Sequence, residues 1–240
     1  MMLPSIAFAL VASAQTADLA SSTRVVVPIV GSVTGVADVQ WRTMLELYND
    51  APQPRDVLLT LPATSDQNWM AFTLEPGESK VFNDVVGEEF GLGQALSPLM
   101  VQTSGRRSVR VRASAYGVRG SEVFKPQPIT VEYGGQNMSQ RYLRSLSFND
   151  DFRTNIGLAN LGETDAVFVL ALRHVEGRNL AVTRITLAPN ALWHLPIQRL
   201  FPLITAGNDF TIAVECWAPN TYVYASVIEN ATNSAVFVHP

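Results

Sequence analysis

The feature that most constrains the fold of this 240-residue sequence is an internal repeat with an offset of 111 to 113 residues. Residues 41–49 (WRTMLELYN) match residues 152–160 (FRTNIGLAN), with arginine, threonine, leucine and asparagine in common. Further matches follow in the same order: 59 and 61 with 170 and 172, 72–76 with 185–189, 113–114 with 225–226, and 121–124 with 234–237. A period this long is far beyond the ~20–50 residues of solenoid units, so each copy is expected to form a complete domain with its own core.

Both copies have the pattern of β-strands. Short apolar or β-branched runs, such as residues 56–61 and 166–172, are bounded by turn-forming residues. In residues 108–115 arginine alternates with valine, which predicts one face in water and the other in a core. The expected fold class is therefore all-β, with two tandem Ig-like β-sandwich modules that arose from an internal duplication.

Turn and linker residues divide the chain further. Residues 75–78 and 188–191 place proline second and a glycine or asparagine third, which predicts tight turns between neighbouring strands. Residues 84–91 and 197–204 are expected to form short helical connectors. The expected segments are a signal peptide (1–14), an N-terminal segment (15–23), the first module (24–128), a linker (129–139) and the second module (140–240).

The N-terminus predicts export. Residues 3–12 are apolar, and the Ala-Ser-Ala pattern of residues 12–14 predicts cleavage before Gln15. No lysine or arginine precedes the apolar run, so a short strand or helix of a cytosolic protein is the alternative. The apolar run is too short to span a bilayer, and the single cysteine, Cys216, permits no disulfide framework within the chain. We expect a secreted protein, periplasmic or extracellular, without a membrane span.

Composition argues against nucleic acid as a partner. Apolar residues make up 47% of the sequence and charged residues 16%, a globular balance, and the net charge of −4 gives no basic footprint.

The aromatic-Arg-Thr strand, the Pro-Gly turn and the aromatic residue of the last strand together resemble those of uncharacterised secreted bacterial proteins with tandem Ig-like modules. This resemblance extends over both copies. It implies an extracellular β-sandwich and no activity, and it transfers no functional residue to this chain.

No catalytic or cofactor motif is visible. The three histidines, His174, His194 and His239, share no metal-ligand spacing, and no nucleophile elbow, Walker loop or zinc-protease helix occurs. His194 is expected to be a hydrogen-bonded structural residue, with His174 and His239 at strand ends, and Cys216 a buried inert thiol. We expect a protein that is not an enzyme and has no cofactor.

Three groups of polar and charged residues are candidate sites. A Ca²⁺ site at Asn149, Asp150 and Asp151 is conceivable, but the run lacks the required ligand spacing and is expected to be a solvated turn. Glu88 and Glu89 are expected to face solvent. The duplicated Arg42 and Arg153 are expected to bond loop carbonyls or a carboxylate while their stems cover the core edge.

Four aromatic residues of the second copy form the candidate binding surface: Trp193, Trp217, Tyr222 and Tyr224. The expected function is a non-catalytic extracellular interaction or structural module that contacts a protein or a cell surface. A carbohydrate-binding or carbohydrate-active module is the alternative, which an exposed row of aromatics would favour. Strand addition at a sheet edge is a further option. Trp41 and Phe152 are expected to be core or core-edge aromatics.

Overall fold

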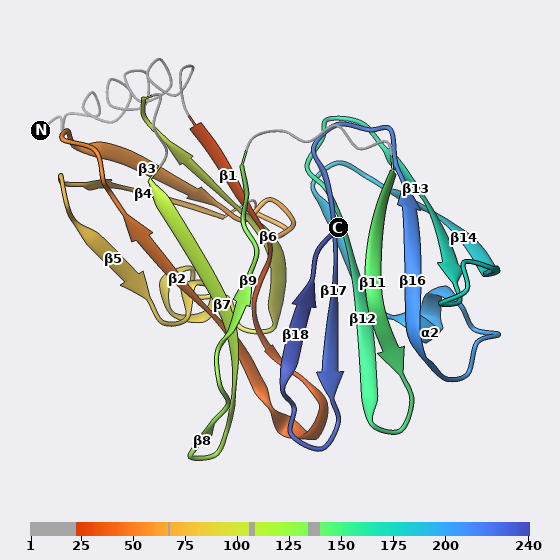
Figure 1. Ribbon diagram of the computed structural model, residues 1–240. Helices are drawn as coiled ribbons and strands as arrows, with labels where there is room; N and C mark the ends of the chain where they lie inside the picture. The colour runs from red at the N-terminus through yellow and green to blue at the C-terminus, as the bar shows by residue number, and fades with distance from the viewer. Residues whose placement is uncertain (1–22, 67, 106–108, 134–139) are drawn as a thin grey trace, which may run out of the picture.

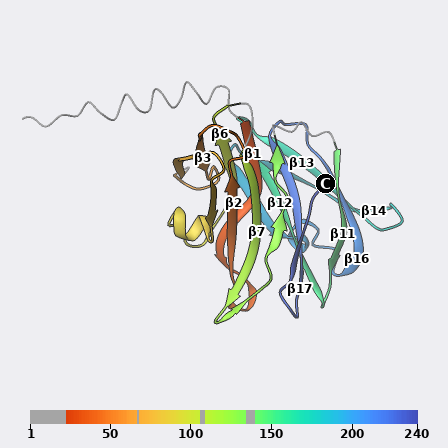
Figure 2. The ribbon, with the colours of Figure 1, turned by 60° about the vertical axis from the view of Figure 1, so that its left-hand side comes forward.

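The computed structural model describes residues 23–66, 68–105, 109–133 and 140–240. Residues 1–14, most of the segment 15–23 and residues 134–139 of the expected linker lie outside the described residues. The described chain is all-β, and every strand pair is antiparallel. Residues 23–133 are called the first half below, and residues 140–240 the second half. The two halves lie side by side (Figures 1 and 2).

The first half has two layers that meet along one strand. Its elements are β1 (Thr23–Thr34), η2 (Val36–Asp38), β2 (Gln40–Tyr48), β3 (Arg55–Thr60), β4 (Trp69–Leu74), β5 (Ser79–Phe82), η3 (Val85–Glu89), β6 (Ala95–Thr103), β7 (Arg110–Arg119), β8 (Glu122–Val123), β9 (Gln127–Ile129) and β10 (Glu132–Tyr133). One layer has the order β4-β3-β6-β1, and the other contains β5, β2, β7 and β8. Strand β1 joins them, because Val33 and Thr34 leave β6 and pair with β2.

The second half has two separate four-stranded sheets. Its elements are β11 (Gln140–Phe148), β12 (Phe152–Asn160), β13 (Ala166–Arg173), β14 (Asn179–Leu187), β15 (Ala191–Pro196), α2 (Ile197–Leu200), β16 (Gly207–Glu215), β17 (Thr221–Glu229) and β18 (Ala235–Val238). The sheet orders are β14-β13-β16-β11 and β15-β12-β17-β18. These orders correspond to those of the first half: β14-β13-β16-β11 matches β4-β3-β6-β1, and β15-β12-β17-β18 matches β5, β2, β7 and β8.

Alternation of apolar and polar residues produces these layers. In β13, buried residues alternate with partly exposed ones, and Phe168, Leu170 and Leu172 point into the core of the second half. In β3, Val57 and Leu59 do the same in the core of the first half. Each half therefore buries one face of each sheet against its own second layer, as a two-layer β architecture requires.

Each half also contains one buried asparagine with the same four hydrogen bonds. The Nδ2 group of Asn49 donates to the carbonyl oxygens of Gln53, Leu74 and Glu75, and its Oδ1 accepts from the Ala51 N–H. The Nδ2 group of Asn160 donates to the carbonyl oxygens of Thr164, Leu187 and Ala188, and its Oδ1 accepts from the Gly162 N–H. Each side chain thus fastens the loop after its own strand to the end of β4 or β14.

The two predicted proline turns are confirmed, but their connection differs from the prediction. Gly77 and Asn190 have φ of 76° and 58°, the left-handed conformation required at this turn position. The Glu78 N–H donates to the Glu75 carbonyl at 3.0 Å. Each turn carries the chain from one layer to the other, from β4 to β5 and from β14 to β15, instead of joining paired neighbours.

The helical connectors and the segment between the halves are short. The helical prediction is confirmed at η3 and α2, each about one turn long. The segment expected to link the halves begins inside the first half, because β9 pairs with β7 and β10 pairs with β1. Among the described residues no helix is long and apolar enough to cross a membrane.

The halves pack together along an apolar seam. Val26 of β1 clusters with Ala159, Leu161 and Tyr222 of the second half. Tyr224 of β17 is fully buried and belongs to the core cluster of the first half. The outer face of the sheet β15-β12-β17-β18, the face turned away from the second half's own core, is therefore covered by the first half.

Candidate functional site

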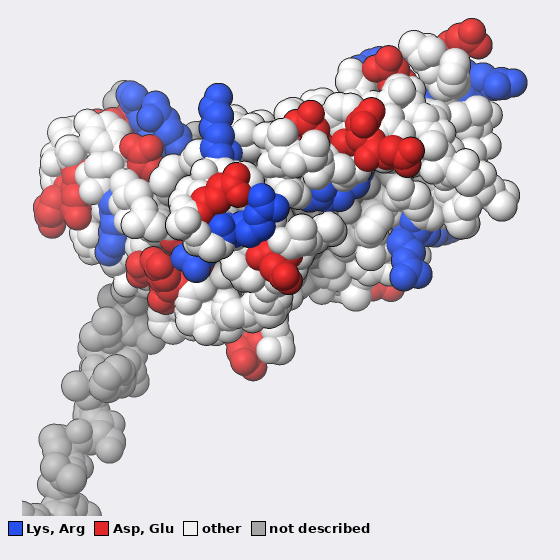
Figure 3. Space-filling view, turned by 90° about the horizontal axis from the view of Figure 1, so that it is seen from below, with Lys and Arg blue, Asp and Glu red and all other residues white. Residues whose placement is uncertain are grey.

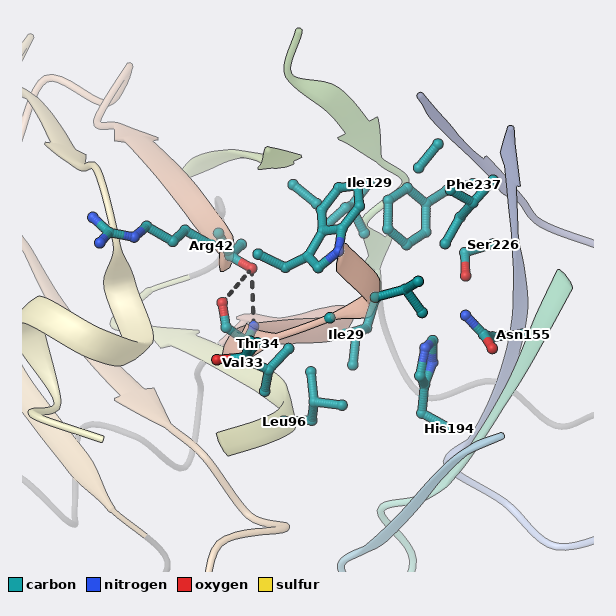
Figure 4. A pocket seen from close by; sticks show the side chains of 18 of the residues that line it. Ile29, Val33, Thr34, Arg42, Leu96, Ile129, Asn155, His194, Ser226 and Phe237 are labelled. Carbon is teal, nitrogen blue, oxygen red and sulfur yellow. Dashed lines mark hydrogen bonds between the residues drawn. The ribbon is translucent and has the colours of Figure 1, made fainter. Parts of the chain in front are cut away.

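Beyond the apolar seam, the two halves enclose a cleft of about 480 Å³. Its walls come from both halves. Apolar residues dominate the first-half wall: Ile29, Val33, Val36, Trp41, Leu96, Ala115 and Ile129. The second-half wall carries the polar groups. Figure 4 shows Asn155, His194 and Ser226 on the side opposite Val33 and Leu96, with Phe237 above.

The polar groups of the cleft occupy adjacent positions on one sheet face. Strand register places Asn155 of β12 directly beside Pro196 of β15 and Ser226 of β17. Two residues further along β12, Gly157 lies between His194 and Tyr224. Because alternate residues of a strand share a face, these two rows lie on one wall and are about 7 Å apart.

Gly157 allows its two neighbours to meet. A Cβ atom at this position would overlap the Tyr224 ring, so only glycine leaves the ring room to lie across the strand. The Tyr224 hydroxyl then reaches His194 Nδ1 at 2.9 Å, and the two rings stack with centroids 5.8 Å apart. The prediction that His194 is hydrogen-bonded is confirmed.

The environment of this pair fixes its protonation. Burial lowers the pKa of His194 to about 4, because the imidazolium would lose its hydration, and burial raises the pKa of Tyr224 well above its usual value. Both groups are therefore neutral at neutral pH. Among the described residues the buried Tyr224 hydroxyl has one partner, His194 Nδ1, and the imidazole tautomer decides which of the two donates.

Two further polar side chains on this wall have no partner. Ser226 is only 3% exposed, and its hydroxyl makes no hydrogen bond with the described chain. The Asn155 amide, partly exposed to the cleft, makes none there either. An unpaired buried hydroxyl is costly, since buried polar groups are normally hydrogen-bonded. The wall therefore presents the Asn155 amide, the Ser226 hydroxyl and the His194 Nε2 atom without partners in the described chain.

The two arginines that line the cleft are engaged elsewhere. Arg42 Nε lies 3.7 Å from Asp84 Oδ2 on the η3 side, and Figure 4 shows its guanidinium pointing away from the cavity. Arg153 donates to the side-chain oxygens of Asn230 and Asn233 at 2.9 and 2.7 Å. Arg42 thus has the carboxylate partner that was predicted, whereas Arg153 bonds side-chain amides in place of the predicted loop carbonyls or carboxylate.

The four aromatics predicted as a binding surface do not share one exposed patch. Tyr222 and Tyr224 are buried in the seam between the halves. Trp193 on β15 is 39% exposed, and Trp217, which follows β16 on the other sheet, is 79% exposed. None of the four lines the cleft, although Tyr224 is bonded to the lining residue His194. Tyr222 and Tyr224 share one face of β17, and the first half covers that face.

The remaining predicted positions lie as follows. Asn149 Oδ1 accepts from the Asp151 and Phe152 N–H groups, which makes residues 149–151 an exposed Asx-type turn. The described residues contain no cluster of three potential metal ligands. Glu88 and Glu89 are exposed, and Cys216 is buried and free. His174 and His239 follow β13 and β18 directly, as predicted.

Trp41 and Phe152 are both partly exposed, and neither belongs to the buried core clusters of the two halves. Trp41 also lines the cleft. Asn155 and Ser226 were missed as candidates because neither belongs to a motif. A signal was nevertheless present in the repeat: where the first copy has Glu46 and Arg112, the second has Gly157 and Tyr224.

Charge on the exterior is mixed. In the face seen from below, lysine and arginine side chains are interspersed with aspartate and glutamate (Figure 3). Several of these form exposed pairs, such as Arg110 with Asp50 and Arg119 with Glu122, both at 2.9 Å. Pairs of this kind contribute little to stability, ~0–1 kcal/mol each.

Comparison with known proteins gives only distant likenesses. No protein-family model and no curated protein sequence matches the chain. Two structures of β-glucuronidase 2 from Bacteroides uniformis are similar, one covalently bound to cyclophellitol-6-carboxylate aziridine and one a calcium-binding mutant. Sequence identities are 9% and 10%, and TM-scores 0.18 and 0.19. The matches cover 82% and 86% of this chain but 23% and 27% of the glucuronidase chains, about a quarter of their length. Likeness at this level carries no argument about function.

Proposed function

We propose that this chain is a secreted, non-catalytic binding protein of two tandem Ig-like β-sandwich modules, and that it binds its ligand in the cleft between them. The observation that carries the proposal is the second-half wall of the cleft. It combines an unpaired, buried Ser226 hydroxyl with an unpaired Asn155 amide inside a mostly apolar cavity. A concave, mostly apolar cavity with a few convergent polar groups is the usual form of a small-molecule site, at ~300–1,000 Å³.

Tandem duplication is supported by two independent features. The sheet orders of the halves correspond strand by strand, and Asn49 and Asn160 make the same four hydrogen bonds at offsets of 111 to 113 residues. Export is supported by the apolar N-terminal residues and the small-residue pattern before Gln15. The resemblance to secreted bacterial proteins with Ig-like modules agrees with both.

Binding is favoured over catalysis by the bonding of the titratable groups. A serine nucleophile needs a base within hydrogen-bond distance. His194 Nδ1 is bonded to Tyr224 instead, and the Ser226 hydroxyl makes no bond to His194 or to any other described residue. This bonding pattern supports recognition of a ligand over its activation.

The test is a screen that compares the full chain with two cavity-filling variants. Small compounds, glycans and peptides are screened by thermal shift and on arrays against wild type, Val33→Trp and Leu96→Trp. The matched control is Val182→Trp, which adds the same side chain at an exposed position of β14, on the other sheet. We expect ligands that bind wild type and the control but neither filled variant. A ligand that binds all four proteins equally would place the site elsewhere.

Carbohydrate binding is the second candidate, and the exposure of Trp217 favours it. An indole that is 79% exposed offers an open face on which a sugar ring can stack. In this case glycan binding should be lost in Trp217→Ala and kept in Val33→Trp, the opposite of the result expected for the cleft.

A further inference from the structure

The chemistry of the cleft wall restricts what can bind there, which deepens the proposed function and depends on it. We infer that the cleft takes a small, uncharged molecule with an apolar body and one polar end that bears a hydrogen-bond acceptor, such as a ketone, an amide carbonyl or a hydroxyl. Three properties of the wall lead to this class: its hydrogen-bonding capacity, the absence of a guanidinium directed at its polar groups, and its apolar opposite side.

The hydrogen-bonding capacity comes from three unpaired groups in two neighbouring rows. The Tyr224 bond occupies Nδ1 of His194 and leaves Nε2, which donates or accepts according to the tautomer. Asn155 adds an amide that donates and accepts, and Ser226 adds a hydroxyl that does both. Two of the three are side by side in the sheet register, so one acceptor atom placed between them is within reach of both.

In the described chain no guanidinium is directed at the polar groups of the wall. Arg42 pairs with Asp84 and Glu88. Arg153 keeps its positive charge, because its partners Asn230 and Asn233 are neutral, but its two terminal NH groups donate to those side chains. His194 is neutral at neutral pH, since its pKa is about 4. An anion bound at Asn155 and Ser226 would lose its hydration without a direct bond to either guanidinium, which costs several kcal/mol in general.

The size and the opposite wall suit an aromatic or alicyclic body. Trp41, Leu96 and Ile129 face the polar row from the first half across a space of about 480 Å³. This volume accommodates a molecule of two or three rings with its polar end directed at Asn155 and Ser226.

The test uses three matched naphthalene fluorophores and the full chain at pH 7. The first is 6-propionyl-2-dimethylaminonaphthalene, a neutral ketone. The second, 2-dimethylaminonaphthalene, lacks the acceptor, and the third replaces the ketone by a sulfonate. We expect the ketone to bind ~3–10-fold more tightly than 2-dimethylaminonaphthalene, as one or two neutral hydrogen bonds allow. We expect it to bind at least ~10-fold more tightly than the sulfonate.

Variants locate the polar contact. Asn155→Leu and Ser226→Ala should each weaken binding of the ketone ~3–10-fold and leave the affinity for 2-dimethylaminonaphthalene unchanged. Met44→Leu and Ser114→Ala occupy the matching positions of the first half and should change neither affinity. Thermal melts of each variant confirm that it is folded.

The outcomes separate the inference from the proposed function. If a probe binds and Val33→Trp abolishes its binding, the cleft is a site; the inference then fails if the sulfonate binds as tightly as the ketone, or if Asn155→Leu and Ser226→Ala leave the ketone affinity unchanged. If no probe binds, or if the filled variants bind like wild type, the inference and the cleft site fail together.

Discussion

The outer faces of two matching sheets differ in the residues at their centres. On the first half, strand register places Glu46 of β2 between Val81 of β5 and Arg112 of β7. Glu46 and Arg112 form an ion pair at 3.7 Å, and Val81 is exposed. On the second half, Gly157 occupies the matching place on β12, between His194 and Tyr224.

The difference shows how the same order of strands can carry a solvent-exposed face in the first half and a buried face in the second. An exposed ion pair keeps its water and needs no cover. Glycine, tyrosine and a neutral histidine have little charge to hydrate, so the first half can pack over them, and the cleft forms where that packing is incomplete. The interiors of the two halves, by contrast, contain equivalent asparagines, Asn49 and Asn160, with matching hydrogen bonds.

The largest expected effect comes from giving the second half the residue of the first. Gly157→Glu would force a side chain into the Tyr224 ring and bury a charge without a partner, so we expect a loss of at least ~4 kcal/mol in unfolding free energy, or failure to fold. Glu46→Gly should cost roughly 1 kcal/mol, from strand entropy and one exposed ion pair. Urea unfolding measures both. Similar costs at the two sites would contradict the packing described here.

Next in size is the loss of the buried asparagines. Asn49→Ala or Asn160→Ala leaves three carbonyl oxygens and one N–H without their partner, and we expect each to cost ~3 kcal/mol. The two costs should agree within ~1 kcal/mol, because the bonds are the same. Asn160→Asp should be as harmful as alanine, since a carboxylate cannot donate to the carbonyls. If one asparagine mattered and the other did not, the shared interior would be refuted.

Sequence patterns were sufficient for the scaffold but not for the site. The repeat, the alternating strands and the proline turns predict the all-β class, the turns at Gly77 and Asn190 and the short helices, because these depend on local periodicity and backbone preference. The cleft depends on which face of the second half is covered, a tertiary fact without local periodicity. Tyr224 was therefore predicted as a possible surface residue although it is buried. Comparing the copies at Glu46 and Gly157 would have indicated the covered face.

Acid should destabilise the protein through His194. The pKa of this residue is about 4 in the folded chain, against ~6.5 in an unfolded one, so between these pH values only the unfolded chain binds a proton. The free energy of unfolding is therefore unaffected by His194 above pH ~6.5 and falls by roughly 3 kcal/mol as the pH decreases toward 4.

The measurement is the unfolding free energy between pH 7 and 4 in wild type and in His194→Gln, which keeps an acceptor for the Tyr224 hydroxyl. The variant should lose less stability over this range than wild type. Val81→His places an imidazole at the matching exposed position of the first half and should add no such loss. Parallel pH profiles for wild type and His194→Gln would show that the imidazole is not desolvated.

The smallest effect is expected at Ser226, where its sign is informative. The hydroxyl is buried and has no partner in the described chain, so it costs free energy in the folded protein while contributing nothing to packing that a methyl group would not. Ser226→Ala should therefore raise the unfolding free energy by about 1 kcal/mol. Ser114, at the matching place on β7, is partly exposed, and Ser114→Ala should stay within ~0.5 kcal/mol of wild type. A residue that destabilises the fold and strengthens ligand binding is typical of binding sites. Ser226→Ala should accordingly gain stability and lose affinity for the ketone probe in the same preparation. If it loses stability instead, the hydroxyl has a partner in the folded chain, and the wall offers the ligand only Asn155 and His194.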